Sequence, residues 1–158
     1  MPVSVGLIRA RAWIVLFCLC LFALGGCTAR FVAGYDDVFD KLATDTQKKT
    51  AAFLLRLQDS GSPSRKFINS RATYDEIIAD IQAMRTRANA NNIDNLNRQT
   101  LGQIETIEQN IQLVQKQHMS SPNGPSIAFV QSAKSLIDIQ FDSMIKLEAA
   151  KKRGEVKS

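Results

Sequence analysis

The stretch LGQIETIEQNIQLVQKQH, Leu101–His118, holds the most regular apolar pattern in this chain of 158 residues. Its apolar residues recur in steps of three and four, which places them on one face of a helix. The positions on this face are Leu101, Ile104, Ile107, Ile111, Val114 and His118. Such a face is stable only when it is buried against other apolar faces, so the pattern predicts a helical bundle.

Three further stretches repeat this spacing of apolar or small residues. They run over about 31–58, 64–90 and 126–152, and the quoted stretch belongs to a helix over about 98–118. Gly and Pro residues at 61–63 and 122–125 form two of the three connections and suit helix ends and starts, and the polar segment 89–97, with five asparagines, forms the third. Short connections make neighbouring helices antiparallel. We therefore expect an all-α fold, an up-down four-helix bundle.

Two of the helix starts depend on local capping signals. Asn97 has the pattern of an N-cap, flanked by two leucines that would form a hydrophobic staple. The second helix has two candidate starts, Ser64 or the capping box at Thr73–Glu76. We favour Ser64, because a helix from that residue includes Phe67 in phase with Tyr74.

The first 27 residues have the features of a secretory signal rather than of a folded element. A cationic start without acidic residues precedes an apolar run, Ala12–Leu24, which is too short to span about 30 Å of hydrocarbon as a helix. Gly25 and Gly26 leave a protease room at the backbone, and Leu24 offers an apolar side chain to its pocket. The thiol of Cys27 is the nucleophile that can take up a lipid.

This pattern resembles the signal peptide of bacterial lipoproteins. The resemblance implies a signal peptide at 1–26, cleavage before Cys27 and a single mature domain at 27–158 that a lipid such as palmitate holds at the membrane. Thr28 is not the aspartate that commonly retains such lipoproteins at the inner membrane. In a source with two membranes the resemblance therefore implies the outer membrane, facing the periplasm. A plain secretory signal and a retained inner-membrane anchor are the alternatives.

Composition limits the chemistry that the mature domain can perform. Cys18 and Cys20 leave with the signal and the lipid uses Cys27, so we expect neither a disulfide nor a thiolate metal site. The chain has 20 Lys and Arg against 15 Asp and Glu, and without Arg9 and Arg11 the mature part has a net charge of +3. A net charge this small does not predict a nucleic-acid-binding face, so we expect no nucleic-acid partner.

Chemically active groups are few in the mature part. A single imidazole without other ligands does not make a metal site, so we interpret His118, the one histidine, as a helix-end boundary residue. The sequence lacks nucleophile-elbow, zinc-protease and phosphate-loop motifs. Asp36, Asp37 and Asp40 would suit a paired-carboxylate site, but a solvated helix face explains them more simply. We expect no enzyme activity, no metal and no cofactor.

Two surface features have two interpretations each. The Asn and Gln enrichment of residues 89–117 is either a wet helix face or a hydrogen-bonding surface for a glycan or a protein. The basic cluster Lys151, Lys152, Arg153 and Lys157 either caps the last helix and solubilises the tail, or contacts anionic head groups. The basic cluster can contact the head groups because an even number of helices returns the C-terminus to the anchored end of the bundle.

Most of the mature chain resembles small uncharacterised bacterial lipoproteins with an all-helical mature domain. The stretches that carry this resemblance are YDDVFDKLATDTQKKTAAFL (Tyr35–Leu54), the Tyr74 region with MRTRA (Met84–Ala88), the helix start at Asn95–Leu101 and IKLEAAKKRGE (Ile145–Glu155). The family brings no established activity with it.

These observations favour a membrane-anchored, non-enzymatic accessory or interaction module of the envelope, with an envelope protein as its partner. The alternative is a carrier of a lipid-like or apolar small ligand inside the bundle. Five side chains would line its interior: Phe53, Phe67, Phe129, Phe141 and Met144. An enzyme acting on the envelope would need a polar cleft, which the sequence does not indicate.

Overall fold

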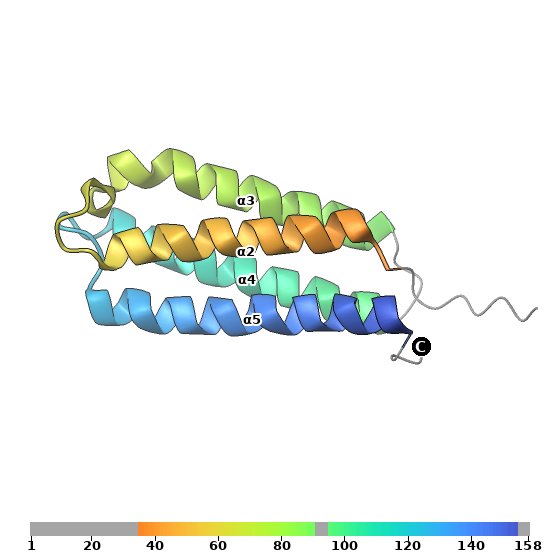
Figure 1. The fold of residues 1–158 in the computed structure, drawn as a ribbon. Helices are drawn as coiled ribbons and strands as arrows, with labels where there is room; N and C mark the ends of the chain where they lie inside the picture. The colour runs from red at the N-terminus through yellow and green to blue at the C-terminus, as the bar shows by residue number, and fades with distance from the viewer. Residues whose placement is uncertain (1–34, 91–94, 155–158) are drawn as a thin grey trace, which may run out of the picture. The chain divides into compact units, whose positions relative to one another are not determined.

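Four helices packed in antiparallel order make up the part of the chain that the structure describes. The structure is a computed structural model that describes residues 35–90 and 95–154, all within one compact unit. The helices are α2 (Asp37–Gln58), α3 (Phe67–Ala90), α4 (Asn95–Met119) and α5 (Ile127–Arg153), with a short 3-10 helix, η1 (Pro63–Arg65), before α3 (Figure 1). The predicted up-down four-helix bundle is confirmed. The predicted signal peptide and Cys27 lie outside the described residues.

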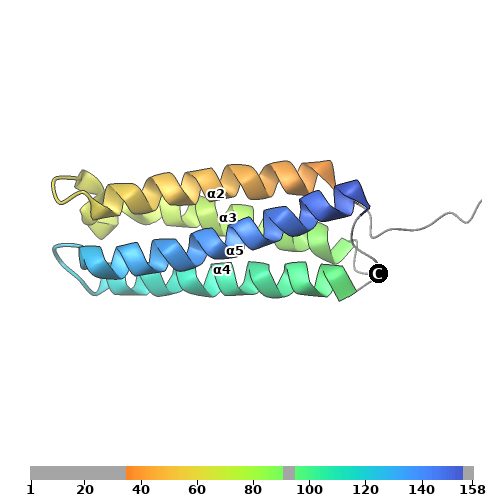
Figure 2. The ribbon, with the colours of Figure 1, turned by 60° about the horizontal axis from the view of Figure 1, so that its bottom comes forward.

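The core runs along the middle of the bundle and receives side chains from all four helices. α2 and α4 each pack against both α3 and α5 (Figures 1 and 2). The stripe predicted on α4 is buried: Ile104, Ile107, Ile111, Val114 and His118 have no exposed surface, and Leu101 packs against the core. Burial of each such aliphatic side chain is worth about 1.5–3 kcal/mol, so this stripe contributes strongly to the bundle.

α2 begins later than the expected residue 31. Asp36 has an extended backbone, and its Oδ1 accepts hydrogen bonds from the main-chain N–H groups of Val38 and Phe39 at 3.0 and 3.1 Å. This N-cap fixes the first helical residue as Asp37. Residues 31–34 lie outside the described part of the chain.

The segment that we expected as one helix from Ser64 is divided into η1 and α3. Lys66 between them is extended, and the capping box at Thr73–Glu76 lies inside α3. The main-chain oxygen of Arg65 lies 2.8 Å from Nε2 of His118. A continuous helix would use that oxygen for its own hydrogen bond, so the tertiary contact accompanies the break.

α4 begins at Asn95, so the prediction of Asn97 as its N-cap is wrong. Asn97 lies in the first turn with its side chain buried, and its Oδ1 accepts a hydrogen bond from Nζ of Lys151 at 3.0 Å. Ser126 does cap α5, since its Oγ accepts from the N–H of Phe129 at 3.2 Å.

The two ends of the bundle differ in what they contain. α2 begins and α5 ends at the same end, which we call the near end; α3 ends and α4 begins there too (Figure 1). The opposite end, the far end, holds η1 and the loops at 59–66 and 120–126. A helix of the length of α2, with 22 residues, spans roughly 33 Å at 1.5 Å per residue. Among the described residues, we find no helix with the length and apolar character that a membrane span needs.

Candidate functional site

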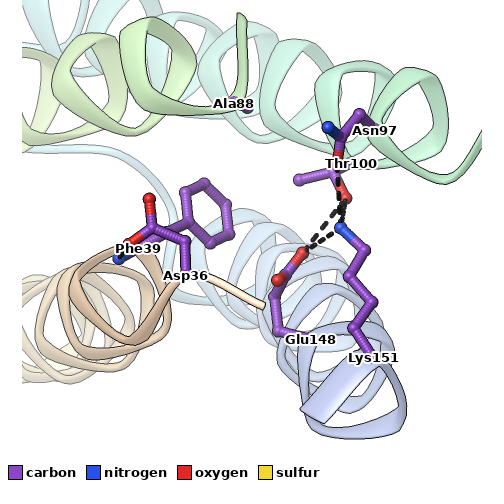
Figure 3. Close-up of a pocket in the computed structure, with 7 residues that line it drawn as sticks. All are labelled: Asp36, Phe39, Ala88, Asn97, Thr100, Glu148 and Lys151. Atoms are coloured by element: carbon purple, nitrogen blue, oxygen red, sulfur yellow. Dashed lines mark hydrogen bonds and ion pairs between the residues drawn. The ribbon is translucent and has the colours of Figure 1, made fainter. Parts of the chain in front are cut away.

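A small polar cavity lies at the near end, where all four helices meet (Figure 3). Its volume is about 10 Å³, which is room for roughly one water molecule. The residues that line it are Asp36, the N-cap of α2, Phe39 of α2, Ala88 of α3, Asn97 and Thr100 of α4, and Glu148 and Lys151 of α5.

Glu148 and Lys151 form a buried ion pair beside this cavity. Nζ of Lys151 lies 2.6 Å from Oε1 of Glu148, and the two side chains are only 3% and 2% exposed. The ammonium also donates to Asn97 at 3.0 Å and to the hydroxyl of Thr100 at 3.4 Å (Figure 3). Burial raises the pKa of Glu148, although hydrogen bonds from Lys151 and Thr100 act in the opposite direction. The pair therefore ties α5 to α4 inside the bundle.

Lys151 was predicted in an exposed basic cluster, and this placement is wrong. It continues the buried stripe of α5 that includes Met144 and Glu148, and only 4% of its surface is exposed. Lys152 and Arg153 are exposed, and Nζ of Lys152 lies 5.0 Å from the centre of the Tyr35 ring. A membrane contact through these two residues stays a prediction, and Lys157 lies outside the described residues.

The acidic residues at the start of α2 have separate structural partners. Arg87 of α3 donates two hydrogen bonds to the carboxylate of Asp36, from Nε at 2.9 Å and from Nη2 at 3.0 Å. Partial burial alone would raise the pKa of Asp36, but hydrogen bonds from Arg87 and from the main chain lower it below its usual value. Asp40 accepts from the hydroxyl of Tyr35 at 2.9 Å, and Asp37 is exposed. These contacts cap α2 and tie it to α3.

His118 lies one residue before the end of α4, as expected of a helix-end residue, but it is completely buried. Its Nε2 faces the main-chain oxygen of Arg65, which only accepts, so geometry assigns the proton to Nε2. Nδ1 then accepts from the hydroxyl of Tyr74 at 3.2 Å. Burial lowers the pKa of His118, which keeps the ring neutral, and raises the pKa of Tyr74. The imidazole joins α3, α4 and η1.

A surface groove of about 350 Å³ lies between the two far-end loops. It is lined by residues 60–63, Arg65 and Lys66 of the first loop and by Pro122 and Asn123 of the second. The guanidinium of Arg65 holds the loops together, since it donates to the main-chain oxygens of Leu57 at 2.5 Å and of Pro125 at 2.8 Å. The two loops that form the groove are therefore joined by a hydrogen bond from Arg65 to Pro125.

The sequence offered a weak signal for the buried pair of Glu148 and Lys151 and none for the hydrogen bonds of Arg65 to the main chain. Glu148 and Lys151 are in phase with buried apolar residues of α5, and charges at such positions point to a buried pair. Arg65 lies in a polar loop, where no spacing rule distinguishes an arginine that joins two loops from a solvated one.

The five side chains proposed to line a ligand cavity belong to the packed core or lie against it. Phe53, Phe141 and Met144 have no exposed surface, and Phe67 and Phe129 pack against the core cluster. Neither the near-end cavity nor the far-end groove is lined by any of the five. A ligand among these rings would require the helices to separate.

The Asn and Gln side chains of the enriched stretch lie largely on the exposed face of α4, which fits both interpretations. Gln99, Gln109, Gln112 and Gln117 are exposed, and two of them donate along the helix, Gln109 to Glu105 at 3.3 Å and Gln112 to Glu108 at 3.4 Å. The first residues of the enriched stretch beyond Ala90 lie outside the described part.

Metal chemistry and similarity add no further site. Within residues 35–90 and 95–154, no group of three or more His, Cys, Asp or Glu side chains is placed to hold a metal ion. Comparison with protein-family models, with curated proteins and with solved structures gave no match. Functional inference therefore rests on this chain alone.

Proposed function

We propose that the protein is a lipid-anchored lipoprotein of the bacterial envelope whose helical bundle is a non-enzymatic interaction module. The observation that carries this proposal is Leu24-Gly25-Gly26-Cys27 at the end of a short apolar run. This pattern supplies both a cleavage site and a lipid acceptor, as expected from its resemblance to lipoprotein signals. A bundle without a catalytic motif then acts through its surface.

The connectivity of the chain supports an anchored bundle. Cys27 precedes Asp36, the N-cap of α2, by nine residues. The chain therefore joins the bundle at the near end, and a lipid on Cys27 would be connected to that end. This arrangement leaves the far end as the part furthest along the bundle from the anchor.

The packed interior favours a module over a carrier. Of the side chains that a carrier would use, Phe53, Phe141 and Met144 are fully buried in the core, and the near-end cavity has room for roughly one water molecule. Native mass spectrometry of the purified full-length protein tests this choice. We expect the mass of the protein alone, whereas a co-purifying small molecule would favour the carrier.

Lipid attachment is tested by replacing single cysteines and labelling cells with radioactive palmitate. Cys27→Ala should abolish the label and block cleavage at Gly26–Cys27, because the acceptor thiol is gone. Cys20→Ala, the same substitution at a cysteine inside the apolar run, should keep both label and cleavage. Normal labelling and processing of the Cys27→Ala protein would overturn the proposal.

The outer-membrane location is a separate part of the proposal. In a host with two membranes, the lipidated protein should fractionate with the outer membrane. Thr28→Asp should retain it at the inner membrane, whereas the Thr28→Ser control should leave its location unchanged. Inner-membrane fractionation of the unaltered protein would contradict this location and leave the lipid anchor standing.

A further inference from the structure

The far end of the bundle carries an excess of positive charge. Asp59 is the only acidic residue between Asp45 and Asp75, and residues 109–137 contain none. Against this one acid the far ends of the helices and their loops carry six cations: Arg56, Arg65, Lys66, Arg71, Lys116 and Lys134. The other described residues are nearly balanced, with 12 acidic and 10 basic side chains. The positive charge of the bundle is therefore concentrated at one end.

Most of these far-end cations have no acidic partner within the described ranges. Lys134 pairs with Asp138 at 2.5 Å, and Arg65 donates to main-chain oxygens. Arg56, Lys66, Arg71 and Lys116 are exposed, and none makes an ion pair in this part of the chain. Uncompensated surface charge of one sign attracts partners of the other sign.

Exposed apolar side chains accompany these cations. Five large apolar residues within two turns of a far-end loop are between 40% and 75% exposed: Leu55, Ile68, Leu113, Met119 and Ile127. Ile68, at 75%, comes two residues after Lys66, and Met119, at 63%, comes three residues after Lys116. Apolar surface mixed with one sign of charge suits a protein partner that supplies both apolar side chains and the opposite charge.

The groove between the far-end loops gives this surface a preformed hollow. Its volume of about 350 Å³ lies within the range of sites that take several side chains or a small ligand. Arg65 and Lys66 line it, so an anionic group is the favoured occupant. Gly124 allows the close loop contact, because a Cβ there would lie 2.8 Å from the main-chain oxygen of Arg65.

We propose that the far end docks an acidic segment of a partner protein that also carries apolar side chains. Carboxylates of the segment pair with Lys66 and Lys116, and its apolar side chains pack against Ile68 and Met119. The choice of a protein over anionic lipid rests on the proposed function, in which the anchor joins the near end, roughly 33 Å away along the helices.

The test uses the purified full-length chain and a fluorescent random copolymer of glutamate and tyrosine as the acidic, partly apolar probe. Fluorescence anisotropy measures its binding to the unaltered protein and to Lys66→Glu/Lys116→Glu. The matched control is Lys41→Glu/Lys146→Glu, which makes the same change in net charge at exposed positions in the near half. Circular dichroism verifies that each variant keeps its helical content.

We expect the far-end variant to weaken binding by about tenfold or more at low salt, and the control to change it by less than about twofold. Lys66→Gln/Lys116→Gln should give an intermediate loss, because it removes charge without reversing it. Polyglutamate, which lacks apolar groups, should bind more weakly than the copolymer.

Three results would overturn the docking proposal. They are absent copolymer binding, an equal loss in both charge-reversal pairs, and tighter binding of phosphatidylglycerol vesicles than of the copolymer through Lys66 and Lys116. The palmitate experiment on Cys27 is independent of these results. Lipidation without copolymer binding would refute the docking surface alone, and copolymer binding without lipidation would refute the anchor alone.

Discussion

The two ends of the bundle both contain buried polar side chains, but they place their charges differently. At the near end a full ion pair, Glu148 with Lys151, is inside the protein, and Asp36 is paired with Arg87. At the far end the buried group is the neutral ring of His118, and the cations lie at the surface. Both ends hold helices together by polar contacts, and within the described residues the excess of positive charge lies at the far end.

The largest effect should come from breaking the near-end ion pair. Lys151→Met removes the ammonium group from the buried carboxylate of Glu148. The hydroxyl of Thr100 still donates to that carboxylate at 3.4 Å, but the opposite charge is gone. We expect the free energy of unfolding in urea to fall by about 3–5 kcal/mol, as is usual when a buried charge loses its partner. Removing one charge of a buried pair costs more than removing both.

The matched control is Lys152→Met, the same change one residue later on an exposed side chain. It should leave stability nearly unchanged, and the double variant Glu148→Gln/Lys151→Met should recover most of the loss. A Lys151→Met protein as stable as the unaltered one would show that the pair does not hold the near end together.

The next effect concerns the loop contact of the far end. Gly124 has φ +83°, and a Cβ would meet the main-chain oxygen of Arg65 at 2.8 Å. Gly124→Ala should therefore lower the free energy of unfolding by about 2–3 kcal/mol. Gly102→Ala on α4 meets no atom within 4 Å and should instead raise stability by about 0.5–1 kcal/mol. Similar effects of both substitutions in thermal unfolding would refute a tight far-end loop.

The sequence predicted what depends on periodicity. The stripe from Leu101 to His118 gave the buried face of α4 because three-and-four spacing fixes which side chains share a face. The last helix was expected from about residue 126, and α5 begins at Ile127 after the Ser126 cap. Helix faces therefore follow from the spacing of residues along the chain.

What the sequence misplaced depends on contacts between helices. Asn97 resembles an N-cap, but its side chain accepts from Lys151, 54 residues away. In the sequence, Lys151 resembles an exposed cation of the C-terminal tail. In the structure its ammonium group contacts Glu148 and Thr100 inside the bundle. The break at Lys66 likewise accompanies the contact between Arg65 and His118, which no local rule contains.

A smaller effect should follow from the hydrogen bond within the far-end polar cluster. Tyr74→Phe removes the hydroxyl that donates to Nδ1 of His118, while the ring keeps its edge contact with Phe53 at 4.7 Å. The buried acceptor is then unpaired, so we expect a loss of about 1–2 kcal/mol in urea unfolding. No loss would mean that Nδ1 does not depend on this donor.

The smallest effect is an opposite response of the two ends to acid. Burial lowers the pKa of His118 below its usual 6.5, so its contribution to stability is present above that pH and is lost as the pH falls. Burial raises the pKa of Glu148 above its usual 4.5, so its contribution is present below that pH and is lost as the pH rises through the folded value.

Urea titrations between pH 7 and pH 4 separate these two contributions. His118→Gln, which can keep both hydrogen bonds, should reduce the loss of stability on acidification. Glu148→Gln should lower stability overall and remove the opposing gain at acidic pH. An unchanged pH dependence in both variants would contradict the assignment of charge at the two ends.

Photo-crosslinking in bacterial cells shows whether the anchored bundle binds its partner through the far end. Benzoylphenylalanine replaces Ile68 at the far end or Val38 at the near end, two apolar residues that are 75% and 50% exposed. We expect a discrete protein crosslink from Ile68 that disappears with Lys66→Glu/Lys116→Glu, and none from Val38. Equal crosslinks from both positions, or a crosslink at Ile68 that survives charge reversal, would show that the far end is not the docking surface.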